Sequence, residues 1–129
     1  MLVKTLLIVY YSFTGGTQQM AEAAFEAAGD KGGVAARLVR AEDCQPEDML
    51  NADGYIFATP ENLAATAGVM KAVLGRCYYL MLGTIYGRSY AAMTCVGAAG
   101  DHAKQQLDSI SPGCGLKKVV ETVTNSAQT

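Results

Sequence analysis

The sequence has no tryptophan and only one histidine, and its four cysteines lie far apart without a C-x-x-C pair. A zinc site needs cysteine or histidine ligands at short spacings, and a dithiol redox site needs two neighbouring cysteines. Neither kind of site is therefore predicted. We expect the cysteines to be reduced and mostly buried, as is typical of a cytoplasmic protein.

Charged residues are also scarce, at 17% of the chain, and the net charge is −2. The ten Lys and Arg residues are scattered apart from Lys117 and Lys118, which argues against a nucleic-acid-binding surface. No apolar run approaches the roughly 20 residues of a membrane-spanning helix. The apolar N-terminal stretch is not followed by a signal-peptide cleavage site. We therefore expect a cytoplasmic protein with no nucleic-acid or membrane partner.

The chain is instead rich in apolar residues, 50% of 129, arranged in alternating strand-like and helix-like segments. This length suits one domain that buries roughly two-thirds of its unfolded surface. Apolar runs predict strands at residues 5–11, 34–39, 54–59, 89–96 and 119–124, the third of which should stop at Pro60. Helical periodicity predicts helices at residues 18–28, 67–77 and 100–110, with at most a helical turn or two at 46–51.

Strands that alternate with crossovers require a parallel sheet with helices on both faces, because such connections are right-handed. We predict a single α/β domain over residues 1–129. Ligands of these sheets bind at the carboxyl ends of the strands, where the strand order reverses. Three loops should meet at that edge: residues 12–17, 59–66 and 97–102.

The loop after the first strand reads Ser12-Phe13-Thr14-Gly15-Gly16-Thr17 and leads into a predicted helix. Free backbone N–H groups and the positive end of the helix converge there. Its three hydroxyl groups can donate hydrogen bonds to phosphate oxygens, and its two glycines allow close approach and positive φ. The loop predicts a phosphate site without a metal. Plain capping of the helix by Thr14 or Thr17 is the alternative.

Other phosphate-binding patterns of α/β proteins are missing. The first strand is followed by neither a G-x-G-x-x-G turn nor a G-x-x-x-x-G-K-[ST] loop. It ends in Tyr-Tyr-Ser rather than in the acidic residues of a receiver domain, and Cys95 has no arginine close by, unlike a thiolate phosphatase. An uncharged, hydroxyl-lined loop suits the phosphate of a tightly held cofactor better than a phosphate that is transferred.

The phosphate loop resembles the [ST]-x-T-G-x-T loop of flavodoxin-like FMN proteins. Thr59-Pro60-Glu61-Asn62-Leu63, followed by Gly68-Val69-Met70-Lys71, is similar to the second flavin loop and helix of the NAD(P)H-dependent FMN reductase and quinone reductase branch. The resemblance covers about residues 3–125. It implies FMN as the cofactor and a flavodoxin-like α/β/α sandwich whose five-stranded parallel sheet has the order 2-1-3-4-5 known for flavodoxins. One departure is Gly16, where many flavodoxins have Asn.

The resemblance also implies roles for individual residues. Those that would hold the FMN phosphate are Ser12, Thr14, Gly15, Gly16 and Thr17, with Phe13 near the ribityl chain. Those that would lie against the isoalloxazine and offer it backbone N–H groups are Thr59, Pro60, Glu61, Asn62 and Leu63. Those that would close its other side are Gly97, Ala98, Ala99, Gly100 and Asp101. The loop at residues 59–63 could instead be a plain strand end, and the loop at residues 97–101 a plain turn. No residue stands out as a catalytic acid, base or nucleophile.

Two functions remain compatible with these residues. The first is an FMN-dependent oxidoreductase that takes hydride from NAD(P)H and reduces quinones or flavins. The second is a flavodoxin-type electron carrier that docks redox proteins without substrate turnover. Such carriers tend to be strongly acidic around the flavin and to flank it with Trp or Tyr. The weak net charge here gives little steering towards a basic partner, so we favour the reductase.

The chain ends at Thr129, where this fold normally continues into a last helix. By the handedness rule that helix would share a face with the first helix, so without it apolar surface over the later strands would be exposed. Exposed patches of this kind usually meet a partner. We expect either a homo-oligomer formed through this face or a shortened version of a longer family member.

Overall fold

The computed structural model describes residues 3–12, 15–30, 32–62, 65–66, 68–81, 85, 87–95, 116–118 and 123–125. Its main strands are β1 (Lys4–Tyr10), β2 (Val34–Arg40), β3 (Gly54–Asn62) and β5 (Ser89–Cys95). They pair in parallel in the order β2-β1-β3-β5. Two short strands, β6 (Lys117–Lys118) and β7 (Val123–Asn125), pair in parallel with the two ends of β5. Together they take the place of the fifth predicted strand, and the predicted order 2-1-3-4-5 is confirmed.

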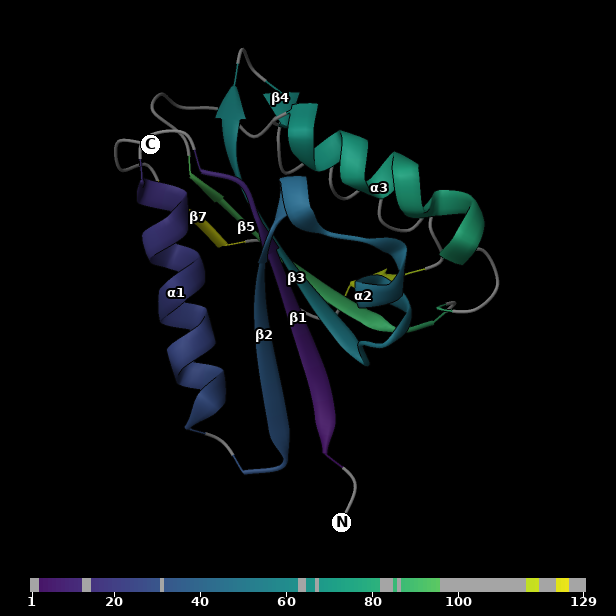
Figure 1. Cartoon of the computed structure of the whole chain (residues 1–129). Helices are drawn as coiled ribbons and strands as arrows, with labels where there is room; N and C mark the ends of the chain where they lie inside the picture. The colour runs from purple at the N-terminus through teal and green to yellow at the C-terminus, as the bar shows by residue number, and fades with distance from the viewer. Residues whose placement is uncertain are drawn as a thin grey trace.

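Helices lie on both faces of this sheet, as Figure 1 shows. One face carries α1 (Gly16–Gly29), and the other carries α2 (Pro46–Leu50) and α3 (Gly68–Met81). A short 3-10 helix, η1 (Ala41–Asp43), precedes α2, so the second crossover is as abbreviated as predicted. The helix predicted at residues 100–110 lies outside the described residues.

Each face of the sheet has its own hydrophobic core, because alternate residues of a strand point to opposite faces. On β1, Leu7 and Val9 pack with Phe57, Met70 and other residues under α2 and α3. The intervening residues of the same strand pack with Ala21 and Ala58 under α1. Burial on both faces explains why β1 is apolar at almost every position.

The third strand does not stop at Pro60, contrary to the prediction. It continues to Asn62 and turns back into β4 (Ala65–Thr66), which pairs with it antiparallel, so the expected open loop at 59–66 is largely a hairpin. The N–H of Tyr11 donates to the carbonyl of Ala58 at 3.0 Å, so the backbone polar groups of Ala58 point towards β1. This direction repeats at every second residue of a strand, so the backbone nitrogen of Pro60 points to the same side. Because β1 has ended there, the missing N–H of Pro60 removes no ladder hydrogen bond.

Candidate functional site

The candidate site lies at the carboxyl ends of the parallel strands, next to β1. The strand order reverses at β1, which has β2 on one side and β3 on the other. Ligands of open α/β sheets bind at such a position. The chain leaves β1 there and enters α1 through Tyr11, Ser12 and Gly15 (Figure 1).

A tight turn shapes the entry into α1. The hydroxyl oxygen of Ser12 accepts a hydrogen bond from the N–H of Gly15 at 3.0 Å, which leaves the hydroxyl proton free to donate elsewhere. Gly15 has a φ of 109°, a conformation that residues with a side chain rarely adopt. A Cβ at this position would meet no atom within 4 Å, so the backbone conformation rather than lack of space requires glycine.

The first turn of α1 presents backbone donors next to this turn. The first hydrogen bond into the helix runs from the N–H of Gln19 to the carbonyl of Gly15 at 3.0 Å. The N–H groups of the preceding helical residues have no partner within the helix, as at every helix start. The first turn contains no acidic side chain that would oppose an anion there.

Thr17 provides the most informative feature of this region. Its side chain is 1% exposed, and its hydroxyl oxygen is the buried side-chain polar atom that lacks a hydrogen-bond partner within the described part of the chain. Leaving a buried hydroxyl unpaired costs about 1–3 kcal/mol, so such a group usually has a partner in the functional state. The alternative of capping by Thr17 is wrong, because the N-cap is Gly15 and Thr17 lies inside the helix with no hydrogen-bond partner among the described residues. Thr14, the other capping candidate, lies outside the described residues.

A second set of buried groups lies at the end of β3. Thr59 is fully buried and its hydroxyl donates to the carbonyl of Pro60 at 3.1 Å. Thr59 is in register with Thr94 of β5, which is also buried. Sequence reasoning missed Thr94, although its place two residues before the end of a predicted strand could have indicated it. Both threonines lie at the same edge of the sheet as the turn before α1.

The structure covers part of the predicted site. The structure describes six of the predicted site residues in full: Ser12, Gly15, Gly16, Thr17, Thr59 and Pro60. For Glu61 and Asn62 it describes the backbone alone. The other predicted residues lie outside the described residues: Phe13, Thr14, Leu63, Gly97, Ala98, Ala99, Gly100 and Asp101. Whether all three loops meet on one ligand stays a prediction.

Among the side chains that the structure describes, the charged groups at this edge lie beside β2. Arg40, in register with Tyr10, forms an exposed ion pair with Glu42 at 3.0 Å. Hydrogen bonding to its own backbone, helped by Arg40, lowers the pKa of the Glu42 carboxyl. Among the described residues, no cluster of His, Cys, Asp and Glu could hold a metal ion. The turn itself therefore offers neutral donors and a helix dipole to an anion.

Comparison with known proteins identifies the family. The sequence profile of the NADPH-dependent FMN reductases matches residues 5–128. The chain belongs to this family. A flavodoxin from Aquifex aeolicus (strain VF5) is 31% identical over 90 residues, which are 70% of this chain and 46% of that flavodoxin. The chain thus spans less than half the length of this curated relative.

Solved structures of other proteins have the same fold as this chain. A flavodoxin from the domain Archaea superposes with a TM-score of 0.82 at 17% identity, covering 96% of this chain and 85% of that one. An apo NADH:FMN oxidoreductase superposes with a TM-score of 0.80 at 19% identity, covering 98% of this chain and 78% of that one. These likenesses confirm the flavodoxin-like fold. Within the described residues, no helix is both long and apolar enough to cross a membrane.

Proposed function

We propose that this protein binds FMN and acts as an NAD(P)H-dependent oxidoreductase that reduces quinones or flavins. The observation that carries the proposal is the buried, unpaired hydroxyl of Thr17 at the start of α1. It lies beside a glycine turn and free backbone N–H groups, at the edge of the sheet where ligands bind. Membership of the FMN reductase family supports the choice of FMN among phosphorylated ligands.

The described residues fit an FMN phosphate. Thr17 and Ser12 would each donate a hydroxyl hydrogen bond, and the first N–H groups of α1 would donate from the backbone. Gly15 allows the chain to turn sharply beside the phosphate. The hairpin of β3 and β4 would lie against the isoalloxazine. When bound, FMN supplies the redox chemistry, accepting hydride from a nicotinamide and passing electrons on, while the protein orients it.

The absorption spectrum of purified protein tests the cofactor. After mixing with FMN and desalting, flavin absorbance should stay with the protein, whereas riboflavin, which lacks the phosphate, should be lost far more readily. Equal retention of both would contradict the phosphate site. Loss of both would contradict flavin binding altogether.

Steady-state kinetics of the FMN-loaded protein test the activity. We expect oxidation of NADPH or NADH that depends on added quinone or flavin. The Aquifex relative bears the name flavodoxin, which keeps the electron carrier as the second candidate. Rapid electron exchange with a reductase protein, together with no turnover of quinones or flavins, would favour the carrier.

We also propose that the protein works in the cytoplasm and that the α1 face of its sheet supports a homo-oligomer. Several apolar residues on the α1 face are half-buried rather than buried, among them Ile56, Ala91 and Met93. Sedimentation velocity over a range of concentrations tests the oligomer. A stable monomer at high concentration that still retains FMN would contradict it.

A further inference from the structure

Arg40 places a positive charge at the carboxyl end of β2, next to the proposed phosphate site. It is the last residue of β2 and is in register with Tyr10, the last residue of β1. From Tyr10 the chain runs through Ser12 to the turn before α1. Neighbouring strands lie about 5 Å apart and two residues span at most about 7 Å, so the Cα atoms of Arg40 and Ser12 lie within about 12 Å of each other. The long side chain of Arg40 can therefore reach a phosphate held at that turn.

The side chain of Arg40 lies on the face of the sheet that α1 covers. Alternate residues of a strand point to opposite faces, and Leu38, two residues before Arg40, packs against the core under α1. Tyr10, in register with Arg40, belongs to the same core. Because α1 covers this face and begins at the same edge of the sheet (Figure 1), Arg40 and the first turn of α1 lie on the same side of the sheet.

Arg40 is already paired with Glu42, which belongs to η1. Nη2 of Arg40 lies 3.0 Å from Oε2 of Glu42, and both side chains are exposed. Exposed ion pairs stabilise a protein little, so a stronger anion can take over the guanidinium. A phosphate at the first turn of α1 would be such an anion, because hydrogen bonds between guanidinium and phosphate are charge-assisted and strong. Glu42 would then compete with the phosphate for Arg40.

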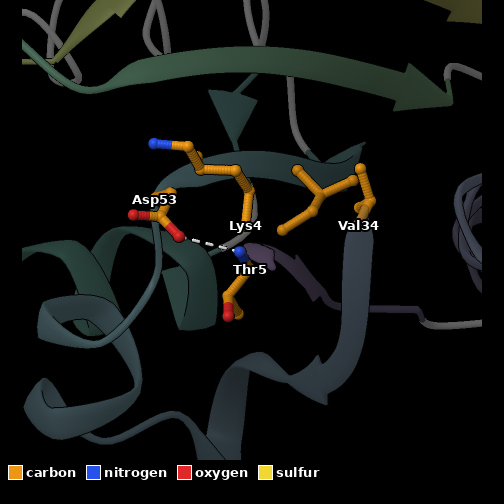
Figure 2. Close-up of a pocket in the computed structure, with 6 residues that line it drawn as sticks. Lys4, Thr5, Val34 and Asp53 are labelled. Carbon is orange, nitrogen blue, oxygen red and sulfur yellow. Dashed lines mark hydrogen bonds between the residues drawn. The ribbon is translucent and has the colours of Figure 1, made fainter. Parts of the chain in front are cut away.

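The other described cations lie at the amino ends of the strands or on the opposite face. Lys4 is on the α1 face but at the amino end of β1, where it lines a hollow with Val34 and Asp53 (Figure 2). Arg37 points to the opposite face and pairs with Asp48 of α2 at 3.0 Å. The remaining ones lie before or at the start of β5, or on α3: Arg88, Lys117, Lys118, Lys71 and Arg76. Among the described cations, Arg40 is therefore the one placed to meet the phosphate.

We propose that Arg40 selects phosphorylated flavin over riboflavin and that Glu42 restrains its guanidinium until the phosphate binds. The inference rests on the proposed FMN site. Fluorescence titrations with FMN and with riboflavin measure the two affinities separately. Arg40→Gln should weaken FMN binding about 3-fold at low salt, with the loss shrinking as salt rises, because the lost interaction is between charges near the surface. Riboflavin, which has no phosphate, should bind this variant as it binds the wild type.

Glu42→Gln tests the competing carboxylate. It should tighten FMN binding about 2- to 3-fold, since the guanidinium is released and a nearby negative charge is removed. Asp43→Asn makes the same charge change one residue later in η1 without breaking the ion pair, so its effect should be smaller. Arg37→Gln removes a cation from the same strand on the opposite face and should leave both flavin affinities unchanged. Circular dichroism checks that each variant is folded.

The outcomes separate this proposal from the phosphate site on which it rests. A wild-type preference for FMN that Arg40→Gln leaves intact would overturn the role of Arg40. Equal losses of FMN and riboflavin affinity in Arg40→Gln would overturn it too, because they would indicate a structural effect. Equal gains from Glu42→Gln and Asp43→Asn would refute the competition by Glu42. A wild-type protein that does not prefer FMN over riboflavin would refute the phosphate site itself, and the role of Arg40 with it.

Discussion

At the scale of the residue, the Thr17 hydroxyl should affect ligand binding and folding in opposite directions. Thr17→Val keeps the shape of the side chain but removes the buried hydroxyl that lacks a partner. We expect the free energy of unfolding without FMN to stay the same or rise by up to ~1 kcal/mol, because an unsatisfied polar group is lost. FMN affinity should fall by about 1–3 kcal/mol, since a hydrogen bond to a charged phosphate is lost.

Fluorescence titration with FMN and chemical denaturation measure these two effects. Thr5→Val, the same substitution at the amino end of β1, is the matched control and should leave FMN affinity unchanged. Unaltered FMN affinity in Thr17→Val would refute the assignment of this hydroxyl to the phosphate.

Tyr55 links stability to alkaline pH. Its hydroxyl donates to the carbonyl of Met49, and burial raises its pKa, with nearby Arg88 partly offsetting the rise. Above about pH 10 the unfolded chain loses this proton while the folded chain keeps it, so the free energy of unfolding should fall as pH rises. Tyr55→Phe should cost about 1 kcal/mol at pH 7 but show a shallower decline above pH 10. Parallel curves from urea unfolding across this range would contradict the linkage.

At the scale of the element, Arg88 ties the α2 connection to the start of β5. Its guanidinium donates to the carbonyls of Leu50 at 2.8 Å and Ala52 at 2.6 Å. Arg88→Ala should lower the free energy of unfolding by about 1–3 kcal/mol, because partly buried carbonyls lose a charged donor. Arg37→Ala, which breaks the ion pair of the exposed Arg37 with the half-buried Asp48, should cost at most about 1 kcal/mol. Equal losses in urea denaturation would show that Arg88 acts only as a surface charge.

Elements were predicted well where local pattern decides them. Continuous apolar runs such as the one in β1 indicate strands buried on both faces, and α1 follows from its 3.6-residue stripe. The hairpin of β3 and β4 was missed because proline was taken to end a strand. Whether β3 can contain Pro60 depends on where the neighbouring strand β1 ends, and this is a property of the sheet rather than of the local sequence.

At the scale of the whole molecule, ligand binding should stabilise the fold by mass action. At an FMN concentration about 100 times the dissociation constant, the gain is about 2.7 kcal/mol. For a domain of this size the melting temperature should rise by about 8–10 °C. Differential scanning calorimetry checks this, and riboflavin at the same concentration should give a smaller rise. Equal shifts with both flavins would argue that the phosphate is not held by the start of α1.

The sequence by itself determined the alternation of strands and helices and the parallel sheet, because these depend on residue periodicity, while the phosphate site at residues 12–17 stays a prediction. It also carried the family resemblance. Only the tertiary structure decided that the Thr17 hydroxyl is buried without a partner among the described residues, and that Thr94 stands beside Thr59. Burial and register arise from residues far apart in sequence, so no local pattern contains them.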